Sequence, residues 1–225
     1  MSGLAVARPS EIAQLLGGAA QMDVPLTESQ AAKLLDYLDL LQKWNKAYNL
    51  TAVRDRSAML KQHLLDSLSI VPYLPPGDLL DVGSGGGLPG IPLAILQPER
   101  SITLIDTVGK KVAFLKQAAL TLGLKNLHAV SDRIESWVPP AEHAAGFALI
   151  SARAYATLST LVGQTRRLVA KNGGWFAMKG VFPEGEMAEL PPDIVVKAVI
   201  PLQVPDLGAE RHLVLLVPAE AAAAA

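Results

Sequence analysis

The sequence predicts a doubly wound, Rossmann-like α/β sheet of about seven strands, preceded by a helical extension. Three observations predict this fold. Short apolar runs alternate with helical stretches from residue 79 onward, a glycine-rich turn follows the first run, and the last two runs have no helix between them. Strand–helix alternation is typical of a parallel sheet with crossover helices. With 225 residues, half of them apolar, the chain can bury a core of its own.

The beginning of the chain predicts helices. Thr27 and Gln30 form a capping-box pattern, and apolar residues then recur at threes and fours as far as Tyr48. A second helix is expected over residues 57–72. Prolines and a glycine at positions 72–77 then predict a boundary.

The remaining elements follow in order along the chain. Parallel strands are expected at residues 79–83, 102–106, 127–131, 147–152 and 175–179, and helices at 90–97, 110–122 and 155–170. The last two strands, 193–201 and 212–217, are joined by a loop too short for a helical crossover, so we expect this pair to be antiparallel. The expected organisation is a helical extension (1–76), a sheet domain (77–218) and a low-complexity alanine tail (219–225).

Composition excludes several classes of site. The chain has no cysteine, which rules out disulfides, thiolate-bound metals and a cysteine nucleophile. Its four histidines are far apart, so no metal site is expected. No apolar run approaches the roughly 20 residues of a membrane span, and the first 20 residues do not resemble a signal peptide. We therefore expect a cytoplasmic protein without a membrane partner.

The charge is unevenly distributed. The whole chain has a net charge of −1, but residues 100–180 carry 11 basic and 4 acidic side chains, a balance of +7. Such a segment can face a polyanion, although ordinary solvated helix faces would explain it equally well.

The segment from Leu80 to Gly90 carries the strongest motif. Gly85, Gly87 and Gly90 satisfy G-x-G-x-x-G between a strand and a helix, the turn that brings backbone N–H groups close to a nucleotide-like ligand. Asp106 ends the next strand, where a carboxylate can accept both ribose hydroxyls. The alternative is a glycine-rich turn with no ligand.

Asp81 separates two candidate cofactors. It precedes the glycines, where a dinucleotide would place its pyrophosphate, and a carboxylate repels that group. S-adenosylmethionine carries an ammonium and a sulfonium in its methionine half, which a carboxylate attracts. Asp81 and the antiparallel end of the sheet therefore favour S-adenosylmethionine.

Several motifs, in order over residues 44–217, resemble the bacterial small-subunit ribosomal RNA methyltransferase G family, also called glucose-inhibited division protein B. The motifs are Asn49-Leu50-Thr51, His63-Leu64-Leu65-Asp66-Ser67, Asp81 to Pro92, Lys110-Lys111, Arg133-Ile134-Glu135, Ser151-Ala152-Arg153-Ala154 and Met178-Lys179-Gly180. The resemblance implies a class I methyltransferase sheet and methyl transfer from S-adenosylmethionine to guanine N7 in 16S ribosomal RNA.

The resemblance also implies particular cofactor contacts. They are Gly83 and Leu88 in the glycine loop, Ile134 and Glu135 after the third strand, and Arg153 after the fourth. The residues themselves add Asp81, Gly85, Gly87 and Asp106.

Candidate RNA contacts lie in the extension and the basic segment. His63, Asp66 and Ser67 share one helix face, although they could equally form a polar cluster that pins the extension to the sheet. Lys110 and Lys111 begin a helix near the cofactor, and Lys179 ends the fifth strand at the ligand-binding edge. Their expected partner is 16S ribosomal RNA or the small ribosomal subunit.

No catalytic base is expected. Guanine N7 offers an in-plane lone pair and loses no proton on attack, so positioning accounts for most of the catalysis. The Asn/Asp-Pro-Pro-aromatic segment of amino-group methyltransferases is absent after the fourth strand. We expect a monomeric enzyme; the alternatives are a small-molecule methyltransferase and a non-catalytic RNA- or ribosome-binding module.

Overall fold

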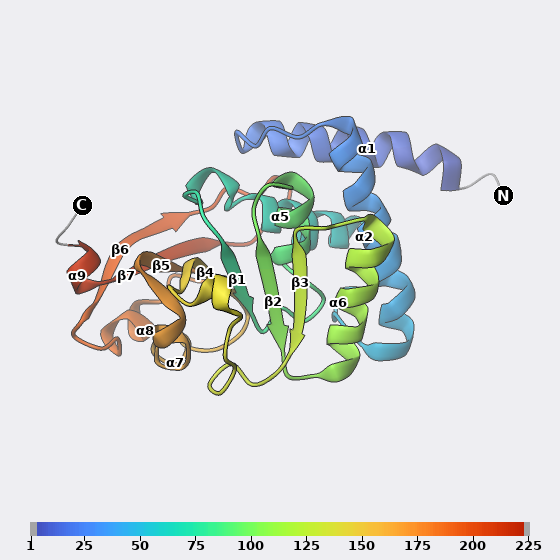
Figure 1. Ribbon diagram of the computed structural model, residues 1–225. Helices are drawn as coiled ribbons and strands as arrows, with labels where there is room; N and C mark the ends of the chain where they lie inside the picture. Colours follow the sequence, from blue (N-terminus) through green and yellow to red (C-terminus); the bar gives the residue numbers. More distant parts are fainter. Residues whose placement is uncertain (1–3, 223–225) are drawn as a thin grey trace.

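A computed structural model describes residues 4–222 of the chain. They contain a seven-stranded sheet in the order β3-β2-β1-β4-β5-β7-β6 (Figure 1). The strands are β1 (Leu79–Val82), β2 (Ile102–Asp106), β3 (Leu127–Ser131), β4 (Phe147–Arg153), β5 (Val169–Lys179), β6 (Ile194–Pro201) and β7 (His212–Pro218). Strand β7 is antiparallel to both β5 and β6, while the pairs among β1–β5 are parallel. The expected antiparallel end of the sheet is confirmed.

Helices cover both faces of the sheet. Helices α5 (Gly90–Leu96) and α6 (Gly109–Leu122) follow β1 and β2 on one face, and α7 (Leu158–Thr165) and α8 (Glu184–Ala188) lie on the other (Figure 1). Strands β2 and β3 are added in turn on one side of β1, and the chain then returns to form β4 on the other side of β1. Because right-handed crossovers in opposite directions lie on opposite faces, this reversal places α7 opposite α5 and α6. Ligands of such sheets bind at the reversal point, outside the carboxyl ends of the strands.

The helix expected over residues 155–170 is shorter than predicted. Helix α7 ends at Thr165, a 3₁₀ turn spans Arg166–Leu168, and β5 begins at Val169 rather than at residue 175. The chain enters the sheet early because Val169 already pairs with Phe147 of β4.

Two long helices begin the described chain. Helix α1 (Leu4–Gln21), which the sequence analysis did not identify as a separate helix, precedes α2 (Glu28–Tyr48). The capping box before α2 is confirmed, since the Thr27 hydroxyl accepts a hydrogen bond from the Gln30 backbone and the Gln30 side chain accepts one from the Thr27 backbone.

The second predicted helix is irregular. Residues 56–73 contain a short α-helix α3 (Arg56–Met59), a π-helix η1 (Leu60–Leu65), one turn of α-helix α4 (Asp66–Leu68) and a 3₁₀ turn η2 (Val71–Tyr73). A π-helix has a wider turn than an α-helix and changes the face to which later side chains point. The prediction of a helix over 57–72 is confirmed as far as Leu68, with an unpredicted change to π geometry at Leu60–Leu65 and an end four residues early.

The extension and the sheet share one apolar core. Leu34, Leu38 and Leu41 of α2 belong to the same buried cluster as Ile91 of α5 and Phe114 of α6. A second cluster fills the other face of the sheet around Trp175 and Phe147. The boundary expected between residues 76 and 77 lies in the bend before β1, but it does not separate two cores.

The chain closes with the β6–β7 pair and a short helix. Helix α9 (Ala219–Ala222) contains the first part of the predicted alanine tail, and residues 223–225 lie outside the described residues.

Candidate active site

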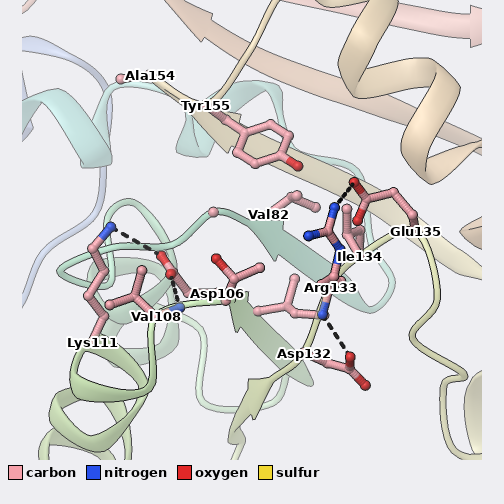
Figure 2. Close-up of a pocket in the computed structure, with 13 residues that line it drawn as sticks. Val82, Asp106, Val108, Lys111, Asp132, Arg133, Ile134, Glu135, Ala154 and Tyr155 are labelled. Carbon is pink, nitrogen blue, oxygen red and sulfur yellow. Dashed lines mark hydrogen bonds and ion pairs between the residues drawn. The ribbon is translucent and has the colours of Figure 1, made fainter.

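A cavity of about 410 Å³ opens at the carboxyl ends of β1, β2 and β3. Four of its lining residues are predicted cofactor contacts: Gly83, Asp106, Ile134 and Glu135. Figure 2 shows Asp106, Arg133 and Tyr155 around it. The volume lies within the range of small-molecule sites, roughly 300–1,000 Å³. We call this cavity the first cavity.

Asp106 connects the glycine loop with the start of α6. One of its carboxylate oxygens, Oδ2, accepts a hydrogen bond from the Gly85 N–H at 3.0 Å, and the other, Oδ1, accepts one from the Val108 N–H at 2.8 Å. The Lys111 ammonium lies 3.6 Å from Oδ2 (Figure 2). Since a carboxylate offers about four lone-pair sites, Asp106 retains acceptor capacity toward the cavity.

The glycine loop owes its shape to positive φ angles. Gly83, Gly85 and Gly87 have φ of +66°, +56° and +87°, values that residues other than glycine rarely adopt. A Cβ on Gly83 would lie 2.3 Å from the ring of Tyr155, and one on Gly87 would lie 2.4 Å from Ile91. Gly83 therefore lets Tyr155 close over the cavity, and Gly87 lets α5 pack under the loop.

The far wall follows β3. Ile134 is 4% exposed and gives the cavity an apolar side, while the Glu135 carboxylate accepts a hydrogen bond from the Gln164 side chain at 3.0 Å and lies 3.5 Å from the Arg133 guanidinium (Figure 2). The Tyr155 hydroxyl donates to Gln164 at 2.6 Å. Tyr155 and Arg133 were not predicted as cofactor contacts, because Tyr155 lies outside every quoted motif and the resemblance implied only the last two residues of Arg133-Ile134-Glu135.

Asp81 does not line the first cavity. Its side chain is fully buried, Oδ1 accepts from the Ser151 hydroxyl at 2.8 Å, and Oδ2 has no hydrogen-bond partner. Burial raises the pKa of Asp81 to about 6, and the hydrogen bond from the Ser151 hydroxyl acts in the opposite direction. Asp81 lies beneath the loop, beside Gly90, and its expected contact with the methionine half of a cofactor stays a prediction.

Leu88 is also part of the core. It is 6% exposed and packs in the apolar cluster that contains α2 and α6. Neither Leu88 nor Gly85 nor Gly87 lies in the lining of the first cavity. The cofactor contacts expected of these three residues stay predictions.

The two candidate lysines of α6 differ. Lys110 is exposed, whereas Lys111 lines the first cavity beside Asp106. Lys111 therefore faces the expected cofactor cavity. The sequence pattern alone did not distinguish this position from that of an RNA contact.

A second cavity of about 370 Å³ adjoins the first. It lies between the π-helix η1 and the carboxyl ends of β4 and β5, and Ala154 lines both cavities. Arg153 lines only the second cavity, so its expected place in the cofactor cleft is not what the structure shows. We call this cavity the second cavity.

Asp66 holds two arginines at the second cavity. Its Oδ2 accepts from Arg153 Nη1 at 2.8 Å, and its Oδ1 accepts from Arg211 Nε at 2.8 Å. Arg153 also donates to the Gln62 carbonyl oxygen at 2.9 Å. Asp66 therefore ties the extension to β4 and to the residue before β7.

His63, Asp66 and Ser67 are not free surface contacts. They are 4%, 2% and 0% exposed. Burial, followed by the charge of Arg153, lowers the pKa of His63 to about 4, so its ring is neutral at pH 7. The alternative interpretation, a polar cluster that pins the extension to the sheet, describes how these residues pack, and their contact with RNA stays a prediction.

Lys179 is paired rather than free. Its ammonium donates to the Ala156 carbonyl oxygen and to both carboxylate oxygens of Glu186, at 2.7 and 3.0 Å. Lys179 lines the second cavity at the expected edge of the sheet, but its charge is balanced by Glu186.

Arg211 was missed by the sequence analysis. It comes 145 positions after Asp66, its partner, and belongs to no local motif. Only the antiparallel return of β7 beside β5 brings it to the site.

Two kinds of site find no support in the described residues. Among residues 4–222, no group of three histidine, aspartate or glutamate side chains is arranged to hold a metal ion. Within the same range, no helix is both long enough and apolar enough to cross a membrane.

Similar solved structures define the class of fold. One is an S-adenosylmethionine-dependent methyltransferase from Aquifex aeolicus, with a TM-score of 0.58 and 16% identity over 79% of this chain and 98% of that one. Another is TrmN from Thermus thermophilus, with a TM-score of 0.53 and 19% identity over 79% of this chain and 52% of that one. At such identities the likeness concerns the fold alone, which is that of the class I methyltransferases.

Sequence comparison then gives the family. The model of rRNA small subunit methyltransferase G matches residues 30–214. Proteins named ribosomal RNA small subunit methyltransferase G are 50% identical in Chromobacterium violaceum, over 91% of this chain and 97% of that protein, and 53% identical in Burkholderia vietnamiensis, over 89% of each. The chain belongs to the rRNA small subunit methyltransferase G family.

Proposed function

We propose that this protein transfers a methyl group from S-adenosylmethionine to N7 of a guanine in 16S ribosomal RNA. Family membership, with about 50% identity over nine-tenths of the chain, is the observation that carries the proposal. It makes the protein an S-adenosylmethionine-dependent ribosomal RNA methyltransferase, and the choice of guanine N7 is the finer step that we propose.

The first cavity fits this cofactor. Asp106 retains acceptor capacity for ribose hydroxyls, and Val82, Ile105 and Ile134 offer apolar walls to a purine. When bound, the cofactor supplies an electrophilic methyl group on a positively charged sulfur. The chain itself supplies the acceptors and the shaped wall that orient it.

The residues of the site support transfer without a proton acceptor. In the reaction, the guanine N7 lone pair forms the new bond to carbon while the bond from carbon to sulfur breaks, and its electron pair stays on sulfur. No proton leaves N7. His63, the one histidine among the lining residues of the two cavities, is neutral and buried, so the protein's task is to position the two reactants.

The test is to map the methylated nucleotide. We expect small ribosomal subunits from cells that lack the protein to accept one methyl group from labelled S-adenosylmethionine, and nuclease digestion with mass spectrometry to identify the product as 7-methylguanosine. Methylation of a different base atom would contradict the N7 assignment. Methylation of metabolites but not of RNA would favour a small-molecule methyltransferase.

A catalytically silent RNA-binding module is the remaining alternative. It predicts no binding of S-adenosylmethionine in calorimetry. In either case RNA binding should weaken as salt rises, because contacts with phosphates release counterions. Loss of one phosphate contact should flatten the slope of log affinity against log salt by about 0.7–0.9. Lys110, exposed at the start of α6, is the candidate for such a contact.

The proposal includes a monomeric enzyme that acts in the cytoplasm, where ribosomal RNA is made. Sedimentation of the purified protein with and without cofactor tests the oligomeric state. Fractionation of cells tests the location.

A further inference from the structure

The second cavity has the position of an acceptor site. It adjoins the first cavity at Ala154, the residue after β4, which lines both. Ala154 has φ of +51°, a strained value for a residue with a Cβ. Methyl transfer requires donor and acceptor atoms roughly 3–3.5 Å apart and in line, so the acceptor must enter a space that opens onto the cofactor's.

The polar wall of this cavity is preorganised. Asp66 is 2% exposed and fixes the guanidinium groups of Arg153 and Arg211, each at 2.8 Å. Arg153 makes both of its bonds through Nη1, and Arg211 uses Nε and Nη1. Within the described residues, Nη2 of each arginine makes no hydrogen bond, so both retain donors for a ligand.

An unsatisfied buried atom also belongs to this wall. His63 is 4% exposed, its Nε2 lies 2.8 Å from the Thr51 hydroxyl, and its Nδ1 has no partner. A buried polar atom without a hydrogen bond is costly and is uncommon outside functional sites. The π-helix η1 carries His63, and π-turns occur frequently at functional sites.

The remaining wall suits a flat ring. Ala154 and Met178 are apolar lining residues, and a methionine sulfur makes favourable contacts with aromatic rings. A guanine offers an acceptor, O6, next to N7, and donors at N1 and at the exocyclic amine. A guanidinium donor at O6 would hold the base while leaving the N7 lone pair directed at the methyl group.

We propose that the second cavity holds the guanine base that receives the methyl group, and that Arg153 and Arg211, fixed by Asp66, orient that base toward the first cavity. This inference rests on the proposed function. It assigns Arg211 a positioning role that no local sequence motif indicates, and it places Arg153 on the acceptor side.

The experiment compares Arg211→Gln, Arg211→Lys and a matched control. Arg166→Gln removes the same charge from another arginine–aspartate pair, with Asp193, at the amino end of β5 and away from both cavities. For each variant, the dissociation constant of S-adenosylmethionine is measured by calorimetry. Single-turnover methyl transfer to small-subunit RNA is measured at saturating RNA and over a range of RNA concentrations.

We expect Arg211→Gln to slow the single-turnover rate at saturation by at least tenfold, since a charge-assisted hydrogen bond is lost from the oriented state. The cofactor dissociation constant should stay within twofold of the native value. Arg211→Lys, which retains a cation, should recover part of the rate, and Arg166→Gln should behave like the native protein. Unchanged circular dichroism establishes that the variants are folded.

Three results would overturn the assignment, each for a distinct reason. Weaker cofactor binding in Arg211→Gln, with RNA kinetics unchanged, would mean that the cavity holds the methionine half of the cofactor. A higher KM for RNA with an unchanged saturating rate would indicate a phosphate contact. Native behaviour of Arg211→Gln in every measurement would remove the residue from the site. If the native protein itself methylates no ribosomal RNA, the proposed function fails, and this inference fails with it.

Discussion

At the scale of single residues, the aspartates of two neighbouring strands have different environments. Asp106 lies in the wall of the first cavity and holds the Gly85 and Val108 N–H groups, whereas Asp81 is fully buried beneath the loop. Asp106 is the last residue of β2, whereas Asp81 lies one residue before the end of β1 and pairs with Leu104. We therefore expect Asp106 to be the carboxylate that binds the cofactor.

Asp106→Asn should weaken S-adenosylmethionine binding by about tenfold or more, because it replaces a charge-assisted acceptor worth about 1.5–3 kcal/mol by a neutral amide. Isothermal calorimetry measures the change. Asp132→Asn is the matched control, since Asp132 lines the same cavity but is exposed and bonds only its neighbour's backbone; we expect its dissociation constant to stay within about threefold. Equal effects of the two substitutions would contradict a specific role for Asp106.

The rate of methyl transfer should be nearly constant between pH 7 and 9. No enzyme group accepts a proton from N7, and the pKa of His63, lowered to about 4 mainly by burial, leaves this residue neutral throughout the range. Asp81, whose pKa is raised to about 6 by burial, is ionised there. Single-turnover rates at saturating RNA and cofactor provide the measurement, and a rising limb that disappears in His63→Ala would show that His63 acts as a base.

The same histidine predicts how stability changes in acid. Its folded-state pKa lies below the ordinary value of about 6.5, so the unfolded chain takes up the proton first. The stability that the neutral ring contributes is present above pH 6.5 and is lost as the pH falls toward 4. Asp81 has the opposite effect. Because its pKa is raised in the folded state, its protonated carboxyl stabilises the fold at low pH, and this stabilisation is lost as the pH rises through 6. Denaturant unfolding of His63→Asn should therefore show a weaker loss of stability between pH 6.5 and 4 than unfolding of the native protein.

At the scale of elements, the alternation of parallel strands and helices and the antiparallel end of the sheet were predictable, whereas irregular helices were not. The family resemblance implied Ile134 and Glu135 as cofactor contacts, and the structure places both in the lining of the first cavity. The π-helix η1 gave no signal, because its apolar spacing is compatible with a regular helix. Its cause lies in tertiary contacts, the burial of His63 and Asp66 against β4, that a local pattern does not contain.

Helix α2 also supports the glycine loop directly. The Tyr37 hydroxyl is fully buried and donates to the Gly86 carbonyl oxygen at 2.6 Å. Desolvation raises the pKa of this phenol well above its ordinary range, so it remains protonated and a donor. This contact couples the extension to the loop that shapes the first cavity.

Tyr37→Phe should lower the free energy of unfolding by about 1–2 kcal/mol, because the Gly86 carbonyl is left without its donor in a buried place. Tyr48→Phe removes the same atom from a tyrosine of the same helix that is 39% exposed, and we expect it to leave stability within about 0.5 kcal/mol. Urea unfolding of both variants measures the difference. A loss no larger in Tyr37→Phe than in Tyr48→Phe would mean that the hydrogen bond does not support the loop.

At the scale of the whole molecule, the extension is part of both the core and the site. It supplies Tyr37 to the glycine loop, and Gln62, His63 and Asp66 to the second cavity. The sequence indicated where the extension ends, since prolines mark the boundary, but not that its apolar stripe and the sheet domain complete one cluster. That cluster depends on packing between distant segments, which apolar periodicity cannot assign to a partner.

A chain reduced to residues 77–225 should consequently fail to fold, because its α5 and α6 would expose to water the apolar surface that α2 covers in the native protein. The graded counterpart is Leu38→Ala, which removes a fully buried side chain from α2; a loss of about 2–5 kcal/mol is expected from the cavity it leaves. Circular dichroism and urea unfolding test both, with the full-length native chain as reference. A truncated chain that unfolds cooperatively and still binds S-adenosylmethionine would show that the sheet domain is independent, and that the extension serves only the acceptor side of the site.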